Sequence, residues 1–139
     1  MAVFTKEIQV ASKGENDVVD LTEEVRGAVR EAGVVNGIVT VFVPGSTAAV
    51  TTMEFEPGLV RDFPAMLERV SPRDIEYEHQ KAWSDNNGHS HVKAALVGPS
   101  LTVPFVKRDI VLGTWQQVVF VELDLRPRTR RIVLQIVGE

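Results

Sequence analysis

The sequence contains no cysteine, so the chain can form neither a disulfide framework nor a thiolate metal site. It also has no apolar stretch near the ~20 residues that span a bilayer. Its first residues lack the basic region and apolar run of a secretory signal. From these absences we expect a cytoplasmic protein that makes no membrane contact.

Positive charge is not in excess either. The chain has 15 Lys and Arg residues against 19 Asp and Glu, with both signs interspersed and a net charge of −4. A nucleic-acid surface is normally basic and clustered, so we expect no nucleic-acid partner. An apolar fraction of 44% is typical of globular proteins, and 139 residues suffice for one core. We therefore expect a single domain over residues 1–139.

The first third of the chain alternates between strand and helix patterns. Alternation from Phe4 to Val10 predicts a half-buried strand. An amphipathic helix follows, with Thr22 as its N-cap and Gly33 at its end. The continuous apolar run Gly37–Val43 predicts a strand that is covered on both faces.

The middle of the chain has a strand pattern at Ala48–Met53, which leads directly to Glu54. Residues 57–70 have a helical apolar face interrupted by Pro64, which indicates either two short turns or one kinked helix. Val92–Val97 has helical character and ends at Gly98-Pro99.

The last part of the chain is rich in strand patterns. Leu101–Val106 and Ile110–Leu112 predict short strands, the first at an edge because it contains a proline. Trp115–Asp124 and Arg130–Val137 predict a long terminal antiparallel pair. Together the elements predict an α+β domain with a largely antiparallel sheet and helices packed on one face.

All three histidines lie between positions 79 and 91. Imidazole supplies acid-base and metal-binding capacity near neutral pH. In an extended segment His89 and His91 would project from the same face. If the following helix extends back to His89, the two side chains diverge instead, and the helix N-terminus offers N–H groups to an anion.

Further candidates flank the predicted strands. Glu54 could be a general base, a metal ligand or a partner for an imidazole, or only a solvated charge. Of the neighbours Trp115 and Gln116, at most one faces a pocket from a strand, and the tryptophan also suits a core. Arg128 and Arg130 share a strand face and could clamp a phosphate, or form a solvated edge.

A metal or an anion could occupy the histidine region. Gly88 allows a sharp turn or close approach to a ligand, and Asn87 is also a common turn former. Without thiolates, we expect His79, His89 and His91 to converge on a divalent metal, zinc before magnesium. The alternative is metal-free binding of a phosphate or sulfate. No organic cofactor is expected.

Five motifs in this order resemble the YjbQ-type family, also described as secondary thiamine-phosphate synthases, over nearly the whole chain. They are Ser46–Val50 followed by Glu54, Tyr77-x-His79, Asn87–His91, Leu112–Gln117, and Arg128-x-Arg130 with Gln135–Gly138.

The resemblance implies a small α+β fold that assembles as a compact homotrimer. It also implies a cavity near a subunit boundary, lined by histidines and able to hold a metal ion or an oxyanion. Many members have His-Thr-Ser after the second strand, where this chain has Gly45-Ser46-Thr47. A function that depends on that additional histidine is therefore absent or altered here.

The family is associated with weak transfer of hydroxymethylpyrimidine diphosphate to thiazole phosphate, with release of pyrophosphate. Under this hypothesis the catalytic candidates are Glu54, His79, Asn87, His89, His91 and Gln116, and the substrate-binding candidates are Ser46, Thr47, Gly88, Trp115, Arg128 and Arg130. The chain lacks a glycine-rich phosphate loop and an aspartate-rich magnesium motif, so we expect modest catalysis, lost in His89→Ala. The alternative is a non-catalytic homotrimeric module that binds a small anion or a metal.

Overall fold

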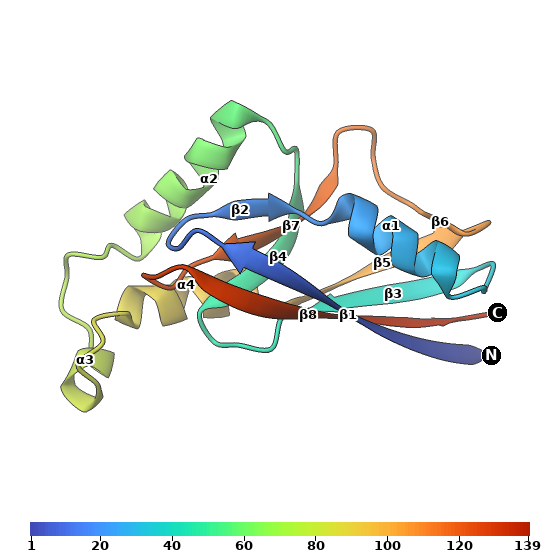
Figure 1. Ribbon diagram of the computed structural model, residues 1–139. Helices are drawn as coiled ribbons and strands as arrows, with labels where there is room; N and C mark the ends of the chain where they lie inside the picture. Colours follow the sequence, from blue (N-terminus) through green and yellow to red (C-terminus); the bar gives the residue numbers. More distant parts are fainter.

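The computed structural model describes residues 1–139 as two antiparallel sheets and four helices (Figure 1). The larger sheet has the order β1 (Ala2–Ser12), β8 (Arg128–Gly138), β3 (Gly37–Phe42), β5 (Ser100–Val106) and β6 (Asp109–Ile110). The smaller sheet has the order β2 (Val18–Asp20), β7 (Gln117–Glu122) and β4 (Ala48–Met53). The helices are α1 (Thr22–Glu31), α2 (Pro57–Val70), α3 (His79–Ala82) and α4 (Gly88–Val97). The predicted α+β class is confirmed.

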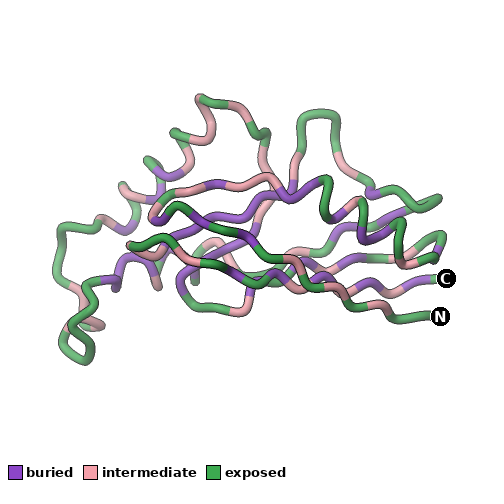
Figure 2. The backbone as a smooth tube through the Cα atoms, in the orientation of Figure 1, coloured by how far each residue is buried: buried purple, intermediate pink, exposed green.

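The central strand of the smaller sheet, β7, is buried along nearly its whole length (Figure 2). Side chains alternate across a strand, and in β7 Val118 and Phe120 join the larger apolar cluster with α1 and the inner face of the five-stranded sheet. Val119 and Val121 join a second cluster, which includes Leu67 of α2 and Ala94 of α4. The helices thus lie on two sides of this sheet, and the prediction that all pack on one face is wrong.

The predicted terminal strand pair does not form. β8 pairs with β1 along its whole length and with β3, whereas β7 lies between β2 and β4 in the other sheet. Alternate residues of β7 and of β8 point into the same apolar cluster, as the sequence pattern predicted. The strands with which they pair lie far away in the sequence. Strand alternation reports which face is buried but does not identify the partner strand.

The strand β3 is covered on only one face within the chain. Val39 and Val41 are fully buried, whereas Ile38 and Phe42 are 46% and 40% exposed on the opposite face. The prediction of a strand covered on both faces is therefore not met by a single copy of the chain.

The predicted limits hold for α2 but not for α4. α2 is one continuous helix of 14 residues despite Pro64, and the Glu56 side chain caps it by accepting the N–H groups of Gly58 and Leu59. α4 begins at Gly88, four residues before the predicted start, so it includes two of the histidines. No helix in the structure is long and apolar enough to cross a membrane.

Candidate functional site

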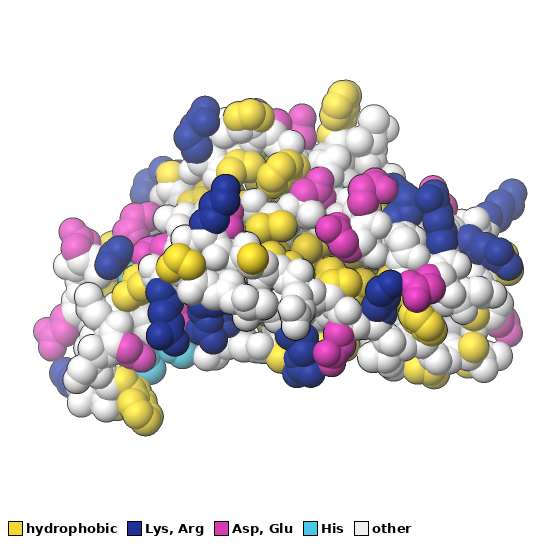
Figure 3. All heavy atoms as spheres, in the orientation of Figure 1, with side chains coloured by type: hydrophobic (Ala, Val, Ile, Leu, Met, Phe, Trp, Pro, Cys, Tyr) yellow, Lys and Arg dark blue, Asp and Glu magenta, His cyan; other side chains and the backbone are white.

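A pocket of about 490 Å³ lies where the start of α4 meets the loops that precede β4 and follow β7. We call it the polar pocket; it is lined by Ser46, Thr47, Asp85, Asn87, His91, Asp124, Leu125, Arg126 and Arg128. Leu125 is the one hydrophobic residue in this lining. Figure 3 shows histidine atoms at the α3–α4 end of the molecule, next to a group of basic side chains. The lining suits a small polar or charged ligand.

His91 lines this pocket, and His79 packs against it without being part of the lining. Their ring centroids are 4.4 Å apart, with the planes tilted by 51°. Nε2 of His79 is buried without a hydrogen bond and lies 3.7 Å from the Asp85 carboxylate. Burial, followed by the charge of His79, lowers the pKa of His91, although Asp85 and Asp124 act in the opposite direction. His91 is therefore neutral near pH 7.

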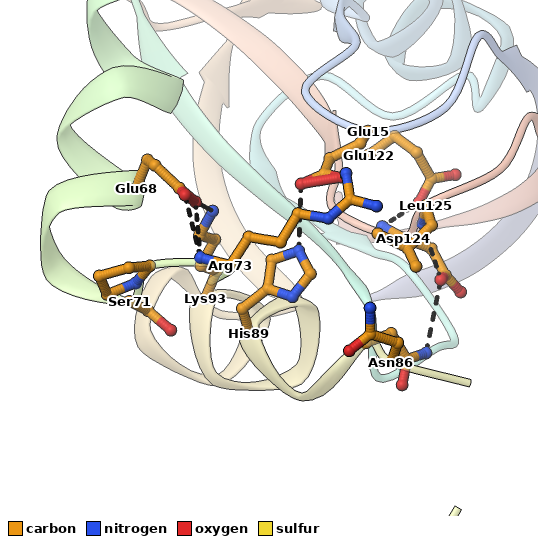
Figure 4. A network of polar contacts seen from close by, with 12 residues as sticks. Glu15, Glu68, Ser71, Arg73, Asn86, His89, Lys93, Glu122, Asp124 and Leu125 are labelled. Atoms are coloured by element: carbon orange, nitrogen blue, oxygen red, sulfur yellow. Dashed lines mark hydrogen bonds and ion pairs between the residues drawn. The ribbon is translucent and has the colours of Figure 1, made fainter. Parts of the chain in front are cut away.

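The third histidine points elsewhere. His89 is fully buried, and its Nε2 lies 3.1 Å from Oε1 of Glu15, whose other oxygen pairs with Arg73 at 3.1 Å (Figure 4). Residues two apart on a helix differ by about 200° in direction, so His89 and His91 diverge. No group of three or more histidine or acidic side chains is arranged to hold a metal ion. The predicted convergence of three histidines is not found within the chain.

Asp124 organises the opposite wall of the polar pocket. Its Oδ2 accepts hydrogen bonds from Thr47 at 3.0 Å and from Arg128 at 2.8 Å, and its Oδ1 accepts one from Asn87 at 3.4 Å. Burial opposes ionisation of Asp124, but these bonds and the Leu125 backbone N–H together lower its pKa. Asp124 is thus a carboxylate at neutral pH that fixes the surrounding side chains.

The two predicted phosphate-binding arginines have different environments. Arg130 is only 4% exposed and donates to Glu122 from Nε at 3.0 Å and from Nη2 at 2.6 Å. Its Nη2 also donates to the Thr47 hydroxyl at 2.8 Å, so Arg130 supports the pocket wall from behind. Arg128 does line the pocket. Arg126 lines it too, is exposed, and forms no ion pair with the carboxylates of the chain.

Three other predicted residues are remote from the polar pocket. Glu54 follows the end of β4, and Trp115 and Gln116 precede β7, whereas Thr47 and Asp124 lie at the opposite end of this strand pair. Each of these strands has six residues, and its five residue steps separate the two ends by about 17 Å. Trp115 is 71% exposed on the loop that projects between β6 and β7 (Figures 1 and 2). These three side chains do not meet His91 within one chain.

Gly88 packs so closely against its neighbours that there is no room for a side chain at this position. A Cβ there would lie 2.6 Å from the Tyr77 side chain, so Gly88 lets the segment before α3 pack against α4. Asp85, Asp124 and Arg126 also line the pocket, although no sequence motif points to them. They lie in loops or at a strand end, where charged residues are ordinary. These three residues come together around one pocket only in the folded chain, so the sequence carries no signal that identifies them.

The chain matches the family model described as UPF0047 protein YjbQ-like over residues 6–139. It is 40% identical to a UPF0047 protein of Methanothermobacter thermautotrophicus over 139 residues, which is 100% of this chain and 95% of the relative. A crystal structure of a YbjQ-like protein of unknown function from Sulfolobus solfataricus superposes with a TM-score of 0.93 at 33% identity, covering 99% of each chain.

A second solved structure supports the same assignment. It is an uncharacterized conserved protein of the YjbQ/UPF0047 family from Clostridium acetobutylicum, with a TM-score of 0.86 at 34% identity, covering 95% of this chain and 99% of the other. The family match and both superpositions extend over nearly the full length of the chain. This chain belongs to the UPF0047 (YjbQ-like) family.

Proposed function

We propose that the polar pocket binds the phosphate groups of a small molecule. The single observation that carries this proposal is the pair Arg126 and Arg128 in a lining that is otherwise almost entirely polar. Arg126 forms no ion pair, so its guanidinium is available to an anion, and guanidinium groups bind phosphate by forked hydrogen bonds.

The reaction we propose is low-efficiency transfer of hydroxymethylpyrimidine diphosphate to thiazole phosphate, as the family resemblance implies. The bond between the pyrimidine methylene carbon and the diphosphate oxygen breaks, and its electron pair leaves with pyrophosphate. A bond forms between the thiazole nitrogen and that carbon. Arg126 and Arg128 stabilise the charge that develops on the leaving group, and His91 donates a ring N–H to it.

A divalent metal does not fit the three-histidine site that the sequence predicts. His79 and His91 offer two imidazoles, but Nε2 of His79 is buried, and only His91 lines the pocket. His89 is held by Glu15, and no third ligand is in place. We therefore assign no step of the reaction to zinc or magnesium.

Pyrophosphate release tests this function directly. Purified protein is incubated with both thiamine precursors, with and without added zinc or magnesium, and pyrophosphate and thiamine phosphate are quantified. We expect slow release that requires both substrates and yields equal amounts of the two products. Binding of inorganic phosphate without turnover would contradict the transferase and support the alternative, a non-catalytic anion-binding module.

We also propose that the chain assembles as a homotrimer through the outer face of the five-stranded sheet. Val3, Ile38 and Phe42 are exposed on strands of this sheet, and exposed apolar sheet surface is commonly buried between subunits. Light scattering should give a trimer, and Phe42→Asp should shift it toward monomer. The matched control is Val70→Asp on α2, where the apolar side chain is also exposed. A monodisperse wild-type monomer at micromolar concentration would refute this assembly.

A further inference from the structure

A second cavity of about 410 Å³ adjoins the polar pocket. We call it the apolar compartment; it is lined by Gly45, Ser46, Ala48, His91, Ala94, Ala95 and Pro99. Ser46 and His91 line both cavities, so the two are halves of one cleft. The apolar compartment contains no carboxylate or guanidinium in its lining, in contrast to its neighbour.

Helix α4 lines both cavities, and its residues account for the change from a polar to an apolar lining. His91, Ala94 and Ala95 are spaced i, i+3 and i+4, so they lie on one side of the helix. His91 stands at the junction, and the next turn presents only methyl groups. The cleft therefore changes from polar to apolar within one helical turn beyond His91.

Gly45 keeps the facing wall free of a side chain. A Cβ at this position would lie 2.9 Å from Nη1 of Arg130, which two hydrogen bonds to Glu122 hold in place. The space that a side chain would need is thus already occupied by the guanidinium. A substitution of Gly45 would disturb Arg130 and, through it, Thr47, so the compartment is better tested from α4.

We propose that the cleft is selective for phosphate monoesters that carry a compact apolar group. The phosphate lies in the polar pocket, and the apolar group lies in the apolar compartment, with the ester oxygen near His91. This inference rests on the proposed function, because it requires the polar pocket to bind phosphate. Ala94 and Ala95 are then specificity-determining residues, since their small size leaves room for the apolar group.

Ala95→Leu tests the compartment with little risk to the fold. Ala95 is exposed on α4, and leucine is a good helix former. Calorimetry with inorganic phosphate and with phenyl phosphate gives two dissociation constants for each protein. In the wild type we expect phenyl phosphate to bind about tenfold more tightly than inorganic phosphate. In Ala95→Leu this advantage should disappear while the inorganic phosphate constant stays unchanged.

The matched control is Ala65→Leu, a substitution at an exposed position of α2 outside the cleft, which should retain the full preference. Equal binding of both probes by the wild type, or equal weakening of both in Ala95→Leu, would overturn this inference and leave the proposed function standing. Failure of the wild type to bind inorganic phosphate would contradict the proposed function itself.

Discussion

Arg130→Met is expected to lower the free energy of unfolding by about 3–5 kcal/mol. The substitution leaves the fully buried Glu122 carboxylate without its cationic partner. Ser12 still donates to Glu122 at 2.7 Å and the Asp124 backbone N–H at 3.2 Å, but neither neutralises the charge. Removing one partner of a buried ion pair costs more than the pair itself contributes, because the remaining charge is desolvated and unpaired.

Urea denaturation at a fixed protein concentration measures this loss. Concentration is fixed because assembly would couple the apparent stability to it. The matched control is Arg128→Met, two residues away on β8, where the arginine is about one-third exposed and pairs with Asp124. This pair is partly exposed, and Asp124 keeps hydrogen bonds from Thr47, Asn87 and the Leu125 N–H, so the loss should be clearly smaller than in Arg130→Met. Equal losses for the two variants would show that Glu122 is not buried as described.

A double variant separates the charge effect from packing. Combining Arg130→Met with Glu122→Leu removes the unpaired carboxylate as well as the arginine. We expect this protein to be more stable than Arg130→Met alone.

Elements with strong local patterns were predictable from the sequence. The alternation at Phe4–Val10 and the apolar run from Gly37 both correspond to strands of the structure. Their partners were not predictable, since β1 pairs with β8 more than a hundred residues later. The apparent terminal hairpin failed for the same reason: alternation fixes a face, whereas pairing depends on the whole topology.

The candidate site was predictable in part. Ser46, Thr47, Asn87, His91 and Arg128, which belong to the quoted motifs, all line the polar pocket, whereas their roles stay predictions. The role of His89 was not predictable, because its partner Glu15 lies in a turn 74 residues earlier. The direction of His89 depended on whether α4 begins before or after it, and helix limits are the least certain part of a pattern.

His91→Ala is expected to reduce pyrophosphate release by about 10²–10³-fold, the usual loss for one donor to a developing negative charge. Its melting temperature should change little, since His91 is only partly buried on α4 and alanine favours a helix. His89→Ala should instead lower the melting temperature and leave pyrophosphate release by the folded protein nearly unchanged. It leaves a cavity and removes the His89 contact to Oε1 of Glu15, which then keeps only Arg73, so it lowers stability, while the polar pocket keeps its lining. Full turnover in His91→Ala would remove this residue from the mechanism.

The pH dependence of sulfate binding gives an independent test of His91, because the charge of sulfate is constant over the range used. An imidazolium attracts an anion more strongly than a neutral ring does, so affinity should rise as pH falls. Burial and His79 lower the pKa of His91, so the midpoint of this rise should lie below about 6.5, the ordinary histidine value. His79→Gln removes one cause of that lowering and should move the midpoint upward. His91→Ala should abolish the rise, and a rise that persists in this variant would assign the titration to another group.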